Sequence, residues 1–118
     1  MILFLEYPPC STCQKARAWL DGHGVEYAAR HIKEEKPTLE ELSDWYAKSG
    51  MPLKRFFNTS GLVYKGLGLK DRLPAMTEEE QLRLLASDGM LVKRPVLVTE
   101  DTVLTGFREK EWADALMK

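Results

Sequence analysis

The 118-residue chain lacks an excess of either sign of charge: 17 Lys and Arg stand against 18 Asp and Glu, for a formal net charge of -1. This balance argues against a protein whose main role is to bind nucleic-acid phosphates, because that role requires a strongly basic face. No apolar run reaches the ~18 residues of a membrane span, and the opening MILFLEYPPC lacks the basic region of a signal peptide. We therefore expect a cytoplasmic protein that binds neither a membrane nor nucleic acid directly.

Cysteine is scarce, and both cysteines lie in the tetrapeptide Cys10-Ser11-Thr12-Cys13. A structural disulfide stabilises mainly by closing a long loop of the unfolded chain, so a bridge across two residues has little structural value. In a cytosolic chain this spacing indicates redox or nucleophilic chemistry. Inert cysteines and structural zinc are the competing interpretations. Zinc would need two more ligands, and His23 and His31 are spaced more widely than zinc-binding histidines usually are.

The first part of the chain predicts a strand–helix–strand unit. Residues 2–6 form a short apolar run, which the following Pro-Pro pair ends. From Cys10 onward the apolar residues recur at helical spacing, and the segment 21–24 ends that helix. Residues 25–32 are expected to form the second strand.

The middle part, at about 37–90, is predicted to be a mostly helical insertion. Thr38 is a suitable N-cap with a glutamate three residues later, and Thr77 repeats this capping-box pattern. Gly89 is expected to end the second of these helices. The three tryptophans occupy apolar positions of predicted helices, which favours packing in the core over a cofactor site.

The last part predicts a hairpin of strands at 94–98 and 102–105, followed by an amphipathic helix at 109–117. A strand–helix–strand unit favours a parallel pair with a right-handed crossover. The hairpin adds antiparallel strands. We therefore expect one α/β domain, built on a four-stranded mixed sheet with helices packed against it.

Cys10 is predicted to lie directly before a helix. The free amides of a helix N-terminus favour negative charge, so the pKa of the Cys10 thiol is expected to fall below its reference of about 8.5. Cys13 lies one turn further along, within reach for a disulfide and more shielded. We therefore predict that Cys10 is the nucleophile and Cys13 the resolving thiol. Ser11 and Thr12 supply hydroxyls that can donate to a bound anion.

Arg94-Pro95 is the second candidate element of the site. A proline that opens a central strand donates no ladder hydrogen bond, so its position needs a separate reason. In thiol-redox folds with this order of elements that proline is cis and faces the cysteine loop, which would direct Arg94 at the thiolate. Arginine stabilises thiolates and holds oxyanions or carboxylates in a bidentate manner. The alternatives are a trans proline opening an edge strand and a solvated surface arginine.

Four motifs, in their order and spacing, resemble the arsenate reductase/Spx family over nearly the whole chain. They are Tyr7-x-Pro9-Cys10-x-x-Cys13, Phe56-Phe57-Asn58-Thr59-Ser60-Gly61, Leu85-x-x-Asp88-Gly89-x-Leu91-x-Lys93-Arg94-Pro95 and Gly106-Phe107. The resemblance implies a thioredoxin-like fold in which the helical part is inserted between the first strand–helix–strand unit and the final hairpin.

The resemblance also implies a comparison of anion sites. Glutaredoxin-coupled arsenate reductases use one cysteine, matched here by Cys10, and bind arsenate with three arginines. Arg94 matches one of them. Asn58 stands in the region of the second, and the third has no match near Gly106, although Arg108 is close. These two differences argue against arsenate as the substrate.

The cysteine pair implies a further distinction within the family. Cys13 replaces a residue that is usually not cysteine in those reductases, which favours an internal disulfide over a mixed disulfide with glutathione. Spx-type regulators do carry C-x-x-C, bind the RNA polymerase α subunit and respond to oxidation.

We therefore predict a thiol–disulfide oxidoreductase related to arsenate reductases. It is expected to bind no cofactor and to use thioredoxin or the glutathione/glutaredoxin system as its electron donor. An Spx-like redox-sensing regulator that binds RNA polymerase is one alternative. An arsenate reductase with an altered anion site is the other.

Overall fold

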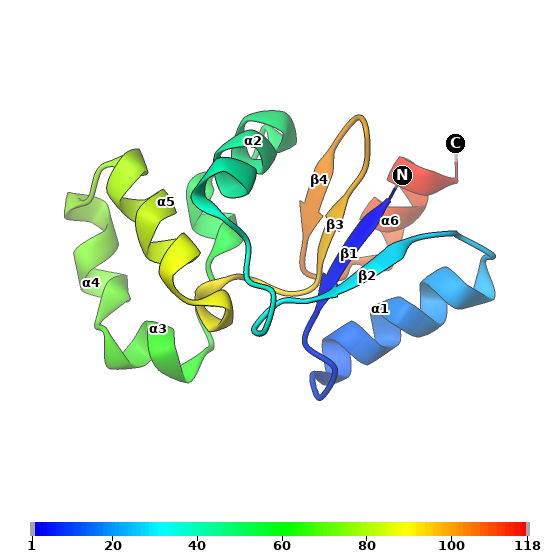
Figure 1. The fold of residues 1–118 in the computed structure, drawn as a ribbon, viewed down its shortest axis with the longest axis horizontal. Coiled ribbons are helices and arrows are strands. Elements are labelled where there is room, and N and C mark those ends of the chain that lie inside the picture. The colour runs from blue at the N-terminus through cyan, green and yellow to red at the C-terminus, as the bar shows by residue number, and fades with distance from the viewer. Residues whose placement is uncertain (1, 118) are drawn as a thin grey trace.

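The computed structural model describes residues 2–117, which build a four-stranded sheet in the order β2-β1-β3-β4 (Figure 1). β1 runs parallel to β2 and antiparallel to β3, and β3 runs antiparallel to β4. The predicted mixed sheet is therefore confirmed. The strands are β1 (Leu3–Glu6), β2 (Ala28–His31), β3 (Val96–Val98) and β4 (Val103–Thr105), and the helices beside them are α1 (Ser11–Gly22) and α6 (Glu109–Leu116).

The two faces of the sheet build two apolar clusters, because successive side chains of a strand point to opposite faces. Phe4 of β1 pairs in register with Leu97 of β3, and both belong to the cluster shared with α1 and with Trp112 of α6. The next pair, Leu5 and Val96, belongs to the cluster shared with the helical insertion. The central strands are thus buried on both sides, which explains why their sequences are almost entirely apolar.

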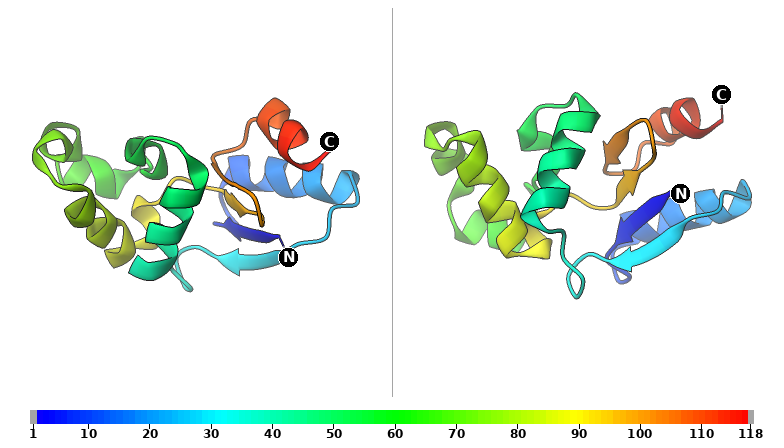
Figure 2. Two further views of the ribbon diagram at one scale, coloured as in Figure 1. Left: turned by 90° about the horizontal axis from the view of Figure 1, so that it is seen from above. Right: turned by 45° about the horizontal axis from the view of Figure 1, so that its top comes forward.

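The helical insertion connects β2 to β3 and lies to one side of the sheet, away from α1 and α6 (Figures 1 and 2). Its longer helices, α2 and α5, pack against each other. Its elements are α2 (Leu39–Ser49), α3 (Leu62–Gly66), α4 (Leu69–Arg72), α5 (Glu78–Ser87) and the 3-10 turns Leu53–Phe56, Leu73–Ala75 and Gly89–Leu91.

Both predicted capping boxes are confirmed. The N–H of Glu41 donates to Oγ1 of Thr38 over 3.1 Å, and the Thr38 N–H donates to a Glu41 carboxylate oxygen over 3.0 Å. Thr77 and Glu80 form the same reciprocal pair at 3.1 and 2.8 Å. The helix starts are therefore encoded locally, by threonine and glutamate at a fixed spacing.

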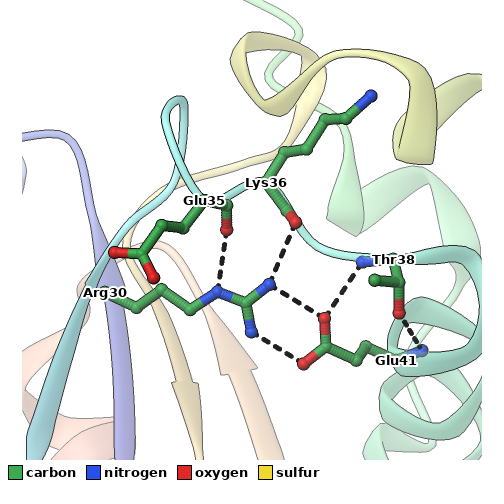
Figure 3. Close-up of polar contacts among 5 residues, drawn as sticks. All are labelled: Arg30, Glu35, Lys36, Thr38 and Glu41. Carbon is green, nitrogen blue, oxygen red and sulfur yellow. Dashed lines mark hydrogen bonds and ion pairs between the residues drawn. The ribbon is translucent and has the colours of Figure 1, made fainter.

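Arg30 of β2 ties the start of α2 to the edge of the sheet (Figure 3). Its Nη1 and Nη2 donate to the two carboxylate oxygens of Glu41 over 2.7 and 2.9 Å. Its Nε and Nη2 also donate to the carbonyl oxygens of Glu35 and Lys36 over 2.7 and 2.9 Å. One guanidinium therefore fixes both the connecting loop and the helix that begins after it.

The second strand is shorter than the predicted segment 25–32, because β2 covers only Ala28–His31. The N–H of Val25 donates to the carbonyl oxygen of Leu20 over 3.0 Å, so this residue belongs to the turn that leaves α1. Pairing with β1 starts where the Ala28 N–H reaches the carbonyl oxygen of Ile2.

The helix before Gly89 ends where expected, but Gly89 does not adopt the left-handed conformation typical of a glycine that ends a helix. α5 ends at Ser87, and Gly89 opens the next 3-10 turn without a positive φ. Glycine is required there by space: a Cβ atom would overlap the carbonyl oxygen of Ile32 and lie 2.9 Å from its carbonyl carbon. The side chain of Asp88 caps this turn by accepting the Met90 N–H over 2.9 Å.

Candidate functional site

Cys10 lies at the junction of β1 and α1, as the residue before the first helical turn. Its backbone is extended, with φ -76° and ψ 125°. Its N–H donates to the carbonyl oxygen of Tyr7 over 2.8 Å and closes the Pro-Pro turn. The amides of Thr12 and Cys13 belong to the first turn of α1, which has no earlier turn to bond, and both act to lower the pKa of the Cys10 thiol.

The pKa of the Cys10 thiol lies below its ordinary value. Burial of the half-buried sulfur by itself raises this pKa. Hydrogen bonds from the Cys13 N–H, the Cys13 thiol, the Thr12 N–H and the Arg94 side chain act in the opposite direction and outweigh it. The arrangement therefore favours the thiolate, the nucleophilic form of cysteine.

Cys13 has the opposite character. Its side chain is fully buried, and this burial is the largest of the effects that raise its pKa to about 12. The charge of Cys10 and a hydrogen bond with it raise the pKa further, while the Tyr7 N–H, which donates to the Cys13 sulfur over 3.5 Å, lowers it. The site therefore favours the thiolate at Cys10 and the protonated thiol at Cys13.

Arg94 lies in the loop before β3, the strand next to β1, and approaches the cysteines from there. Because β3 pairs with β1, the loop that precedes β3 arrives next to the loop that follows β1. The Arg94–Pro95 peptide bond is cis, as expected. The Arg94 guanidinium carbon lies 5.1 Å from the centre of the Tyr7 ring. Its Nε and Nη1 atoms are buried and have no hydrogen-bond partner among residues 2–117.

A cavity of about 640 Å³ opens beside Cys10. It is lined by three separate segments: the start of α1, the 52–60 segment of the insertion, and the residues on either side of the hairpin. No carboxylate from residues 2–117 lines it, although the chain as a whole is close to neutral. The basic residues in its lining are Lys54, Arg55, Lys93, Arg94 and Arg108.

The predicted site residues mostly meet at this cavity. Cys10, Thr12, Asn58 and Arg94 line it, and Cys13 is fully buried in the adjoining first turn of α1. Pro95 is buried next to Arg94. Ser11 is exposed in the first turn of α1 and does not line the cavity.

Two backbone hydrogen bonds hold Asn58 in place, and Gly61 leaves space for its side chain. Its N–H donates to the carbonyl oxygen of Leu91 over 2.7 Å, and its carbonyl oxygen accepts the Gly61 N–H over 3.1 Å. A Cβ atom at Gly61 would lie 2.7 Å from the Asn58 amide nitrogen. A side chain at position 61 would therefore displace the Asn58 amide from its present place.

Several residues of the site carry little or no signal in the sequence. Lys54 and Arg55 line the cavity but come from a short 3-10 turn, so no periodic spacing singles them out. Lys93 lines it from a loop and belongs to a family motif that does not indicate its place. Phe107, also in the lining, belongs to a family motif that does not indicate its place. Tyr7 does have a local signal: it precedes Pro8 and Pro9, which turn the backbone from the end of β1 toward the helix start.

The tryptophans have structural places. Trp45 and Trp112 are buried, and Trp19 is half-buried against Trp112. Residues 2–117 contain no group of three or more His, Cys, Asp or Glu side chains arranged to hold a metal ion. Within the same range no helix has the length and apolarity needed to cross a bilayer.

Three curated proteins are similar to this chain over most of their length. YusI of Bacillus subtilis (strain 168), described as uncharacterized, is 50% identical over 113 residues, which cover 96% of each chain. The regulatory protein MgsR of the same strain is 32% identical over 93% of this chain and 86% of its own. The global transcriptional regulator Spx of Enterococcus faecalis is 30% identical over 94% of this chain and 83% of its own.

A solved structure agrees closely with the fold. The ArsC family-related protein of Bacteroides fragilis is 57% identical, covers 96% of this chain with 95% of its own, and superposes with a TM-score of 0.94. The architecture is thus the thioredoxin-like fold that the sequence motifs implied. The ArsC family model matches residues 5–115, nearly the entire sequence, and the chain therefore belongs to the ArsC family.

Proposed function

We propose that the protein is a thiol–disulfide oxidoreductase, with Cys10 as its nucleophile and Cys13 as its resolving thiol. The observation that carries the proposal is the contrast between the two sulfurs. One is half-buried at a basic cavity with a lowered pKa, and the other is fully buried beside it with a raised pKa. This asymmetry supports the two roles that a dithiol mechanism requires.

In the first step the Cys10 thiolate attacks one sulfur of an oxidised substrate disulfide. The substrate S–S bond breaks, the departing sulfur leaves as a thiolate that takes a proton from water, and a Cys10–substrate mixed disulfide forms. Arg94 stabilises the attacking thiolate and orients any anionic group of the substrate. The basic lining of the cavity favours substrates that carry negative charge.

In the second step Cys13 loses its proton and attacks the Cys10 sulfur, which releases the remaining substrate thiol and leaves a Cys10–Cys13 disulfide. In the mixed disulfide Cys10 is no longer charged, so one of the effects that hold the proton on Cys13 is gone. The resolving thiol therefore becomes easier to ionise only after the nucleophile has reacted. Two electrons pass from the protein to the substrate, and thioredoxin or the glutathione/glutaredoxin system returns them.

Alkylation kinetics test the nucleophile. The rate of iodoacetamide addition to Cys10 should follow a titration below the ordinary pKa of cysteine, and Cys13 should stay unmodified at neutral pH. The Cys13→Ser variant should accumulate a stable mixed disulfide with a substrate thiol or with glutathione, whereas the Cys10→Ser variant should accumulate none. An ordinary thiol pKa at Cys10, or a wild-type protein that forms no reducible Cys10–Cys13 disulfide, would exclude the mechanism.

A redox-switched regulator is the second candidate, because relatives at 32% and 30% identity are regulatory proteins. In this case the same disulfide would change a surface that binds RNA polymerase through its α subunit. A pull-down with the C-terminal domain of α, in reducing and in oxidising buffer, separates the two functions. Redox-dependent binding without turnover of any disulfide would favour the regulator.

Arsenate reduction is the third candidate, supported by the family and by the basic cavity. Asn58, which stands in the region of an expected arginine, lines the cavity, and so do Arg55 and Arg108. An assay of arsenate-dependent NADPH consumption, coupled to thioredoxin or to glutaredoxin, tests this activity. If arsenate causes no NADPH consumption with either thioredoxin or glutaredoxin, arsenate reduction is excluded as the function.

A further inference from the structure

Tyr7 contacts all three reactive residues of the site through different groups. Its carbonyl oxygen accepts the Cys10 N–H over 2.8 Å, and its N–H donates to the Cys13 sulfur over 3.5 Å. Its ring lies under the guanidinium of Arg94, 5.1 Å from ring centre to guanidinium carbon. The two backbone contacts do not depend on the side chain, so the ring has a separate role that can be tested alone.

The buried half of the Arg94 guanidinium has few neighbours that hold it. Nε and Nη1 are buried and meet no hydrogen-bond acceptor from residues 2–117. Groups of the described residues that attract the guanidinium include the sulfur of Cys10 and the face of the Tyr7 ring. A cation over an aromatic face is attracted by the ring electrons, and the attraction grows when water is excluded.

The ring also contacts a second aromatic side chain. His31 of β2 meets Tyr7 edge to face, with ring centres 5.8 Å apart and planes at 88°. The His31 Nδ1 atom accepts the N–H groups of Lys33 and Glu34 over 3.2 and 3.1 Å, which anchors the imidazole to the turn after β2. Contacts therefore run without interruption from that turn through His31 and Tyr7 to Arg94.

We propose that Tyr7 is a positioning residue whose aromatic ring holds the Arg94 guanidinium against the Cys10 sulfur. The inference rests on the proposed function, because it matters only if Cys10 reacts as a thiolate. Without the ring, Arg94 is free to swing into the cavity, and the thiolate loses one of the groups that stabilise it. The hydroxyl group has no part in this role, so phenylalanine should replace tyrosine.

Titration of Cys10 in a set of variants tests the proposal. The thiolate absorbance at about 240 nm and the pH profile of alkylation are measured for the wild type, Tyr7→Leu, Tyr7→Phe and the matched control Tyr27→Leu. Tyr27 is another half-buried tyrosine, in contact with Phe4 and outside the cavity. Tyr7→Leu is expected to lower the thiolate fraction at neutral pH roughly three- to tenfold. Tyr7→Phe and Tyr27→Leu should keep the wild-type titration.

The route through Arg94 is tested by a double substitution. In an Arg94→Met background, Tyr7→Leu should produce no further change in the Cys10 titration, because the group that the ring positions is absent. An equal change in both backgrounds, or an unchanged titration in Tyr7→Leu, would overturn the proposal. If the wild-type Cys10 itself titrates as an ordinary cysteine, the proposed function fails first, so the two failures are distinct.

A measurement on the unmodified protein covers the case in which Tyr7→Leu does not fold. A proton above an aromatic face resonates upfield, so the side-chain N–H signals of Arg94 should be shifted upfield of the other arginines in the wild-type protein. Tyr7→Phe should retain the shift. Arg94 signals at the position of a freely solvated arginine would contradict the stacking and with it the proposal.

Discussion

Neutralising Glu41 removes the charge of the contact that joins the helical insertion to the sheet edge, and it does so with little change in shape. Gln at this position can still accept the Thr38 N–H, because a capping box works with either Glu or Gln. What is lost is the negative charge and, because the amide nitrogen of Gln cannot accept, the hydrogen bond from Nη1 of Arg30 (Figure 3). Glu41→Gln therefore isolates the ion pair from the helix cap.

The size of the effect follows from the burial of the pair. The side chains of Arg30 and Glu41 are 19% and 32% exposed, so the pair is more shielded than a surface ion pair but not fully desolvated. Exposed pairs contribute about 0.2–1 kcal/mol, and hydrogen bonds to charged groups about 1.5–3 kcal/mol. We expect Glu41→Gln to lower the free energy of unfolding by about 1–2 kcal/mol. For a chain of this length each kcal/mol shifts the melting temperature by roughly 3–6 °C.

Glu80→Gln is the matched control. Glu80 holds the same position in the second capping box, and no Arg or Lys of residues 2–117 forms an ion pair with it. Glu80→Gln is expected to lower the free energy of unfolding by less than about 0.5 kcal/mol. Urea unfolding of both variants gives the comparison. Equal losses at Glu41 and Glu80 would show that the Arg30 pair contributes nothing beyond the cap, and the reasoning would be refuted.

The pH dependence gives an independent check of the same pair. The hydrogen bond from Arg30 is the largest effect on the pKa of Glu41, and it holds that pKa below its ordinary value against the opposing effect of burial. A carboxyl whose pKa is lower in the folded state stabilises the fold above its unfolded pKa of about 4.3, and the contribution is lost as pH falls through the folded value. The wild type should therefore lose stability more steeply than Glu41→Gln below about pH 4.5, and parallel profiles would contradict this.

Three further outcomes are expected. Gly89→Ala should lower the free energy of unfolding by about 2 kcal/mol or more, because the new Cβ meets the backbone of Ile32. Its control in urea unfolding is Gly66→Ala, where a Cβ has no neighbour within 4 Å and the change should be neutral or slightly stabilising. Thr77→Ala should cost about 1 kcal/mol through loss of the N-cap, measured in the same way. Arg94→Met should shift the alkylation profile of Cys10 to higher pH without altering the modification of buried Cys13, as followed by mass spectrometry.

The sequence supports those features of the fold that depend on neighbouring residues. A threonine with a glutamate three residues later is enough to place the starts of α2 and α5, because a capping box is closed within one turn. The strand cores are equally clear, since β3 is apolar at every position. The sequence predicts the helix end before Gly89 but not why glycine stands there, because the reason is a contact with the carbonyl of Ile32, far earlier in the chain, which no local pattern contains.

In the candidate site, too, the features set by neighbouring residues are predictable from sequence and those set by distant contacts are not. The C-x-x-C spacing places both sulfurs at a helix start, so the contrast between Cys10 and Cys13 is predictable from a single turn of helix. The cavity is not, because Lys54 and Arg108 approach it from segments that meet only after the insertion packs beside the hairpin. Their charges give no signal in a chain that is nearly neutral overall.

The site is therefore assembled by the pairing of β1 with β3, and its chemistry depends on that register. Leu5 pairs with Val96, so the residue that follows β1 and the residues that precede β3 emerge at the same end of the sheet. Tyr7 and Arg94 meet there by necessity, and Cys10 is returned to the same point by its hydrogen bond to Tyr7. A slip of one residue in this pairing would send the side chains of β3 to the opposite face. The buried pair of Phe4 and Leu97 prevents the slip, so the core of the sheet also fixes where the backbone of Arg94 meets the loop that carries Cys10.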